Sequence, residues 1–168
     1  DDASMVYRHG GFVGLNNDGI ISDCWSIASL NIPAYDSTGT HGVFAGSNAG
    51  IIMNSSAAGS VSASAVQSVS NLGGFTGFNS GYINTSYADS SVYGNAHSAN
   101  RIGGFAGYNY GGHINNSFSN GDPGGSEWMG PANYIGGLVG WNRDGKVTYC
   151  YSTGDVNSHP YSNANGGF

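Results

Sequence analysis

The chain has 168 residues, and only 8 % of them are charged, far below the roughly 25 % of an average soluble protein. Its net charge of −6 comes from ten acidic residues against four lysines and arginines, which argues against a nucleic-acid partner and against an anionic membrane surface. No run of about 18 apolar residues is present, so the sequence predicts no membrane span.

One glycine-rich segment recurs along the whole sequence. Its clearest form, residues 103–109, reads Gly-Gly-Phe-Ala-Gly-Tyr-Asn, and the central apolar residue of each copy falls at position 12, 44, 75, 105, 138 or 168. A period this regular, of about 31 residues, indicates a repeat architecture. We expect a single domain over residues 1–168, with repeats near 10–41, 42–72, 73–102, 103–135 and 136–165 and a partial sixth from 166.

Each repeat has the same order of elements. The glycine-rich segment leads into a short turn of Asn, Asp and Gly, as at residues 17–19, and such residues tolerate the positive φ that tight corners require. A short strand with an aliphatic centre follows, as at Ile20–Ser22, and then a small residue, Cys or Ser. After a further bend, which the Gly-Asp sequences of residues 119–122 and 152–155 suggest, a weaker strand is expected around Val61, Val92 and Val156. A variable loop then leads to the next repeat.

This order predicts an all-β fold, because no window has apolar residues at the helical spacing of i, i+3, i+4 and i+7. We predict a parallel β-solenoid, or β-helix, of about five coils, with about 31 residues and three short strands in each coil. One coil cannot bury its apolar face alone, so the coils must stack in register and bring like residues together. The expected structural ladders are Phe12, Phe44, Phe75, Phe105 and Leu138 inside, and Asn16, Asn48, Asn79, Asn109 and Asn142 at a corner.

Two pairs of residues invite a chemical interpretation. Cys24 and Cys150 occupy the same position in the first and fifth repeats, roughly 19 Å apart at about 4.8 Å per rung, so we expect small buried thiols without a disulfide. His9 and His41 are equivalent residues of adjacent coils and would lie about 5 Å apart. They could share a metal or cap the end of the stack. Because the repeat places no third ligand beside them, we predict no metal and no cofactor.

Two rows of mostly aromatic side chains are the candidate binding surfaces. A row that faces solvent can stack on sugars or on another protein, whereas a row that faces inward belongs to the core. The strands are too short to show which alternative holds, so both stay open. One row contains Trp25, Tyr87, Phe118 and Tyr151, and the other contains Leu15, Phe78, Tyr108 and Trp141. The segment from residue 121 to Tyr134 breaks the composition of the repeat and includes Trp128 and Met129, so we expect an exposed loop that makes a specific contact.

The cleanest repeat supports a family resemblance. Residues 136–142 read Gly-Gly-Leu-Val-Gly-Trp-Asn, and residues 146–156 read Lys-Val-Thr-Tyr-Cys-Tyr-Ser-Thr-Gly-Asp-Val. This pattern resembles the GLUG repeat of large bacterial and archaeal surface or secreted proteins, and the resemblance extends over five copies. It implies a passive extracellular stalk or adhesive module, and the motif carries no catalytic residues. The first two copies depart from it, with His9 and His41 in place of an aliphatic residue and Val43 in place of a glycine.

These observations lead to three functional hypotheses. We expect a non-catalytic structural or adhesive module of a larger cell-surface or secreted protein, which contacts a glycan or protein ligand and is not an enzyme. The first alternative is a filament subunit, because an open solenoid edge invites pairing and identical subunits could stack end to end. The second is a carbohydrate-active β-helix enzyme, which needs two carboxylates facing one groove. The acidic candidates are scattered through corners and loops: Asp89, Asp122, Glu127, Asp144 and Asp155.

Overall fold

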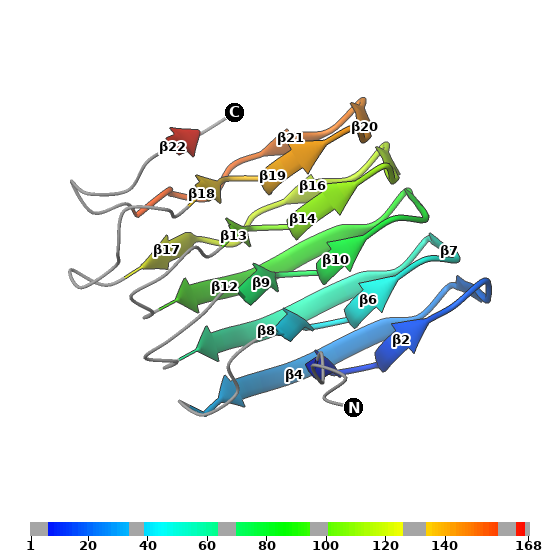
Figure 1. Ribbon diagram of the computed structural model, residues 1–168, viewed down its shortest axis with the longest axis horizontal. Coiled ribbons are helices and arrows are strands. Elements are labelled where there is room, and N and C mark those ends of the chain that lie inside the picture. Colours follow the sequence, from blue (N-terminus) through cyan, green and yellow to red (C-terminus); the bar gives the residue numbers. More distant parts are fainter. Residues whose placement is uncertain are drawn as a thin grey trace, which may run out of the picture.

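The chain folds as a parallel β-solenoid, as the repeat pattern predicted. The computed structural model describes residues 7–33, 39–63, 70–94, 101–125, 134–157 and 164–166. These residues form strands and turns, and none of them belongs to a helix that could cross a membrane. Successive coils pair in parallel, with equivalent residues about 31 positions apart, and the coils stack as a regular ladder of strands (Figure 1).

Four parallel sheets form the walls of the solenoid, and we call them A to D in the order in which a coil passes through them. Sheets B and C have five strands each, so about four turns of chain connect their first strand to their last. Sheet A consists of β1 (Tyr7–Gly10), β5 (Gly39–Gly42), β9 (Ser70–Gly73), β13 (Arg101–Gly103), β18 (Tyr134–Gly136) and β22 (Ala164–Gly166). Sheet B consists of β2 (Val13–Asn16), β6 (Ala45–Asn48), β10 (Thr76–Asn79), β14 (Ala106–Tyr110) and β19 (Val139–Arg143).

Sheets C and D complete each coil. Sheet C consists of β3 (Ile20–Ser22), β7 (Ile51–Met53), β11 (Tyr82–Asn84), β15 (His113–Asn115) and β20 (Lys146–Thr148). Sheet D consists of β4 (Trp25–Ile32), β8 (Ser56–Ala63), β12 (Tyr87–Gly94), β16 (Phe118–Ser119) and β21 (Tyr151–Ser152), and β17 (Pro123–Gly125) also pairs with β12. The long strands β4, β8 and β12 are the most extended elements in Figure 1.

The predicted number of three strands per coil is wrong, because each coil passes through four sheets. The strand absent from the prediction is that of sheet A, which ends at the first glycine of the Gly-Gly-Phe segment, where the repeat pattern predicts the end of a variable loop. It is only three or four residues long in the first five coils, too short to show an alternating pattern. The predicted bend before the last strand occurs in the fourth coil, where β16 and β17 are separate. In the first three coils a single eight-residue strand runs through that position.

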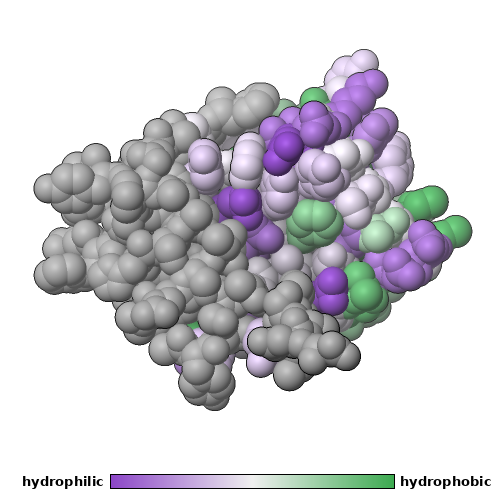
Figure 2. All heavy atoms as spheres, viewed as in Figure 1, coloured by the Kyte–Doolittle hydropathy of each residue, from purple (hydrophilic) through white to green (hydrophobic). Residues whose placement is uncertain are grey.

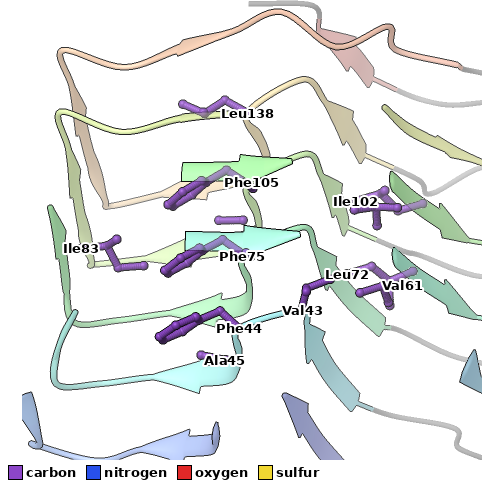
Figure 3. Packing of buried hydrophobic residues seen from close by; sticks show 14 of the residues in the cluster. Val43, Phe44, Ala45, Val61, Leu72, Phe75, Ile83, Ile102, Phe105 and Leu138 are labelled. Atoms are coloured by element: carbon purple, nitrogen blue, oxygen red, sulfur yellow. The ribbon is translucent and has the colours of Figure 1, made fainter. Parts of the chain in front are cut away.

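A column of phenylalanine rings fills one part of the interior. The ring centroids of Phe12, Phe44, Phe75 and Phe105 follow one another at 4.8, 4.7 and 4.8 Å, and the rings are nearly parallel. Leu138 continues the column in the fifth coil (Figure 3). Each fully buried ring contributes about 1.5–3 kcal/mol of hydrophobic stabilisation. Phe44, Phe75 and Phe105 are fully buried, whereas Phe12, in the first coil, is 48 % exposed.

An asparagine column runs beside it at the corner between sheets B and C. Each side-chain amide donates to the Oδ1 atom of the asparagine on the next coil, over 2.8, 2.9, 2.8 and 2.7 Å from Asn16 to Asn142. Each amide also donates to a glycine carbonyl at its own corner. A buried amide is costly unless its hydrogen bonds are made, so this column ties every coil to one register.

Sheets A and B meet backbone to backbone, and glycine makes this contact possible. A Cβ atom added at Gly107 in β14 would lie 2.6 Å from the Leu72 nitrogen and 2.8 Å from the Arg101 carbonyl oxygen. At Gly77, the equivalent residue of β10, the added atom would lie 2.3 Å from the His41 nitrogen. No side chain fits at these distances, so the second residue of β6, β10, β14 and β19 has no room for anything larger than glycine.

We therefore expect Gly107→Ala to destabilise the fold by about 3 kcal/mol or more, because a methyl group would force the two sheets apart. Gly111→Asn is the matched control, since Gly111 has φ +68° with no atom within 4 Å of an added Cβ, and asparagine tolerates this conformation. Urea unfolding followed by circular dichroism measures both variants. Equal stability of the two would contradict the backbone contact between sheets A and B.

Candidate functional site

The first aromatic row lies on the outer surface of sheet D. Trp25, Tyr87 and Tyr151 are 71, 43 and 52 % exposed, and Phe118 is half-buried. The rings of Tyr87, Phe118 and Tyr151 stack at centroid distances of 5.2 and 4.9 Å, with interplanar angles of 8° and 1°. Ser56 takes the equivalent position in the second coil, so Trp25 stands apart from this three-ring stack. The row is therefore a surface stripe rather than core.

The remaining predicted binding residues are distributed differently. Trp128 and Met129 lie outside the described residues. Tyr134 belongs to β18 and stacks on Trp141 at 5.1 Å, so it joins the second aromatic row instead of the first. The structure thus brings together Tyr87, Phe118 and Tyr151, and it separates them from Tyr134.

The second row faces outward from sheet B, beside a matching row from sheet A. The sheet-B row is in register through Leu15, Ser47, Phe78, Tyr108 and Trp141. The sheet-A row is in register through Arg8, Thr40, Asn71, Arg101 and Tyr134. Hydrophobic and strongly hydrophilic side chains lie next to one another on the face of the molecule that Figure 2 shows.

Arg101 is the central charged residue between these two rows. Its guanidinium carbon lies 4.5 Å from the ring centroid of Tyr108 and 4.4 Å from that of Trp141, and its Nη1 atom donates to Asn71 Oδ1 over 3.0 Å. Burial lowers the pKa of Arg101 below its usual value, but an arginine stays protonated in a protein. No carboxylate of the described residues forms an ion pair with it. Within the described part of the chain, aromatic faces and an amide hold its charge, and no acidic side chain neutralises it.

A hollow of about 260 Å³ opens beside Arg101, between sheets A and B. Its lining consists of Arg8, Thr40, Ser47, Asn71, Phe78, Arg101 and Tyr108. Thr40 and Asn71 are 7 and 8 % exposed, and the Thr40 hydroxyl and Arg101 Nε have no hydrogen-bond partner within the described chain. Sequence reasoning missed this site because it missed sheet A. The signal that could have found it is the repeat position that the sheet-A residues of the lining share, two places before the first glycine of each glycine-rich segment.

The two histidines stack as neighbours in sheet A. The ring centroids of His9 and His41 are 5.0 Å apart, and His41 is fully buried. Burial, reinforced by the nearby His9, lowers the pKa of His41 to about 4. Among the described residues, neither ring nitrogen of His41 has a hydrogen-bond partner. In the part of the chain that the structure describes, no three His, Cys, Asp or Glu residues gather as metal ligands.

The cysteines and the serines at the equivalent position form one more column. The thiols of Cys24 and Cys150 donate to carbonyl oxygens two residues earlier, as the hydroxyls of Ser55, Ser86 and Ser117 do. Both thiols are free and half-buried. The prediction that they are buried is therefore wrong in degree, because both occupy outer coils of the stack, where a neighbour covers only one side. Burial raises the pKa of the Cys150 thiol.

The acidic candidates lie at exposed positions. Asp89 is exposed on β12, and Asp122, Asp144 and Asp155 are exposed at turns, while Glu127 is outside the described residues. Asp122 accepts a hydrogen bond from the Asp155 nitrogen over 2.8 Å, which links the same corner of two adjacent coils. This contact gives Asp122 a role in the turn.

Comparison with known families agrees with this geometry. The model of the GLUG motif matches residues 98–122 and 131–157, which include β13 to β16 and β18 to β21. The chain contains GLUG motifs. The resemblance inferred from the repeat pattern is confirmed in these two stretches. Each matched GLUG stretch starts before sheet A and continues through sheets B and C into sheet D, so one motif corresponds to one coil. A search of curated proteins found no match.

The buried His41 makes stability depend on pH in a defined direction. Its pKa is about 4 in the folded chain against 6.5 in the unfolded chain, so the unfolded state takes up the proton first. Stability is therefore lost as the pH falls from about 6.5 to about 4, by up to about 3 kcal/mol. His41→Leu, which copies Leu72 of the next coil, should remove this loss and raise stability at pH 7, because it removes unpartnered buried nitrogens.

Urea midpoints measured from pH 4.5 to pH 7 test this expectation. The control is His113→Gln, which changes an exposed histidine on β15 and should keep the pH dependence of the unmodified chain. If His41→Leu loses as much stability as the unmodified chain over this range, His41 is not the group responsible.

Proposed function

We propose that this chain is a non-catalytic structural and adhesive module of a larger extracellular protein. The observation that carries the proposal is the flat, outward stack of Tyr87, Phe118 and Tyr151 on a scaffold whose interior columns hold every coil in register. The GLUG motifs support it, since they are repeat modules. The role requires neither a metal nor a cofactor.

The geometry of the stripe suits an extended ligand. Its rings are parallel and follow one another at 5.2 and 4.9 Å, so they form a rigid, nearly continuous apolar strip. Aromatic faces of this kind stack on the apolar faces of sugar rings and on other side chains. Because the scaffold is already ordered, little conformational entropy is lost on binding. A polysaccharide or a protein surface is the corresponding ligand class.

End-to-end assembly into a filament is the second candidate, and the exposure of the first coil favours it. Phe12 and Ile20 are 48 and 70 % exposed there, although their counterparts in the next coil are much more buried. A second copy stacked on this coil would cover them as Phe44 is covered by Phe75. Light scattering over a range of concentrations distinguishes the candidates, since a filament subunit forms lengthening rods and an isolated adhesive module stays monomeric.

The adhesive role is tested by replacing the stripe with serine. The triple variant Tyr87→Ser, Phe118→Ser and Tyr151→Ser copies the natural Ser56 of the second coil, so the fold should tolerate it. We expect beads coated with the unmodified chain to be retained on at least one of cellulose, chitin and fibronectin surfaces. We expect retention by the triple variant to fall at least tenfold.

Tyr82→Ser is the matched control, because Tyr82 is a surface tyrosine of sheet C outside the stripe. It should bind as the unmodified chain does. Absence of retention on all three surfaces, or equal retention by the triple variant, would count against an adhesive stripe on sheet D.

A further inference from the structure

The hollow between sheets A and B concentrates positive charge on an acidic chain. The whole sequence has four lysines and arginines and a net charge of −6, yet two of the four, Arg8 and Arg101, line this one hollow. The described residues that line it include no aspartate or glutamate. An uncompensated positive site of this kind attracts an anionic group.

Arg101 is prepared to bind a carboxylate. Tyr108, Trp141 and Asn71 hold its guanidinium in place, and within the described residues this support uses one hydrogen bond, from Nη1 to Asn71. Its buried Nε atom has no hydrogen-bond partner among the residues that the structure describes. A planar guanidinium with free donors matches the two oxygens of a carboxylate, and a fixed side chain loses little entropy when it binds.

Two further polar groups in the hollow are nine-tenths buried. The Thr40 hydroxyl has no hydrogen-bond partner within the described chain, and the Asn71 amide stands next to it in the register of sheet A. A buried hydroxyl without a partner costs free energy. A ligand hydroxyl that fills the hollow would satisfy it.

The shape of the hollow results from one small residue in the second row. Ser47 interrupts the row between Leu15 and Phe78, which leaves a gap of one missing side chain in a column with about 4.8 Å per rung. Phe78 meets Tyr108 edge-on, at 5.5 Å and 74°. The volume of about 260 Å³ lies just below the range of about 300–1,000 Å³ for small-molecule pockets, so the hollow accommodates a single ring.

We propose that this hollow binds one residue of an acidic saccharide, a pyranose ring that carries a carboxylate. Arg101 binds the carboxylate, the ring lies against Phe78 in the gap above Ser47, and Thr40 and Asn71 bind its hydroxyls. Arg8, three rungs from Arg101 and about 14 Å away between Cα atoms, adds long-range attraction. The inference rests on the proposed role as a binding module, and it names a ligand class for a surface separate from the sheet-D stripe.

The test is a calorimetric titration of the whole chain with three acidic probes and one neutral probe. The acidic probes are tetramers of galacturonate, mannuronate and hyaluronan, and the neutral probe is maltotetraose. We expect at least one acidic probe to bind at least tenfold more tightly than maltotetraose, and more weakly as salt is raised. Binding by none of the three, or equal binding of maltotetraose, would overturn the proposal.

Two variants locate the site. Ser47→Tyr continues the aromatic row and fills the hollow, so acidic-probe binding should weaken at least tenfold, while Arg8→Gln should weaken it about threefold or more. Arg143→Gln is the matched control, because it removes the same charge from a residue that is paired with Asp144 outside the hollow. If Arg143→Gln weakens binding as much as Arg8→Gln, the attraction is a general charge effect and the site is wrong. If Ser47→Tyr does not fold, the comparison of acidic-probe binding by Arg8→Gln and by Arg143→Gln still tests the location of the site.

The same measurements separate this inference from the proposed function. The triple serine variant of the sheet-D stripe should bind the acidic probe as the unmodified chain does. Loss of acidic binding in that variant would place the site on the stripe instead. If no acidic probe binds while the stripe still mediates retention of beads, the proposed saccharide site in the hollow is wrong and the proposed adhesive role is unaffected.

Discussion

The structure depends on in-register stacking, in which each residue lies on its own counterpart one coil away. The asparagine column shows why the register is strict. Four of its five asparagines are buried, and the amide of each of these four reaches the Oδ1 atom of the next asparagine only when asparagine lies on asparagine. A shift by one residue would break these hydrogen bonds between coils and turn the phenylalanine column toward solvent.

Stacking also turns the surface into rows, so that a single departure from the repeat changes a whole surface. Ser56 ends the aromatic stripe of sheet D before it reaches Trp25, and Ser47 opens the hollow in the row of sheet B. Neither serine has a functional group of unusual reactivity. Their effect is the space that they leave in a column of larger side chains.

His41 is the departure that carries a cost in the interior. It occupies the column that Leu72, Ile102 and Ile135 continue, and a neutral imidazole fills the space of an aliphatic side chain there. Because the ring is buried and lies against His9, it stays uncharged at neutral pH, and its nitrogens have no hydrogen-bond partner within the described chain. The first two coils, where His9 and His41 lie, are thus the part of the solenoid that we expect to respond first to acid.

The sequence by itself determined the repeat, its period, the parallel solenoid and the GLUG resemblance, because these follow from residue types recurring at a fixed spacing. The glycine, phenylalanine and asparagine positions could be predicted because nearly every copy of the repeat keeps the same residue type there, with Val43 and Leu138 as exceptions. Sheet A could not be predicted from the sequence, because a strand of three or four residues is too short to show an alternation of apolar and polar residues. Only the tertiary structure decided that the two aromatic rows face outward, and that Arg8 and Arg101 line one hollow. Those facts depend on how far the chain turns at each corner, and a one-dimensional spacing does not contain that angle.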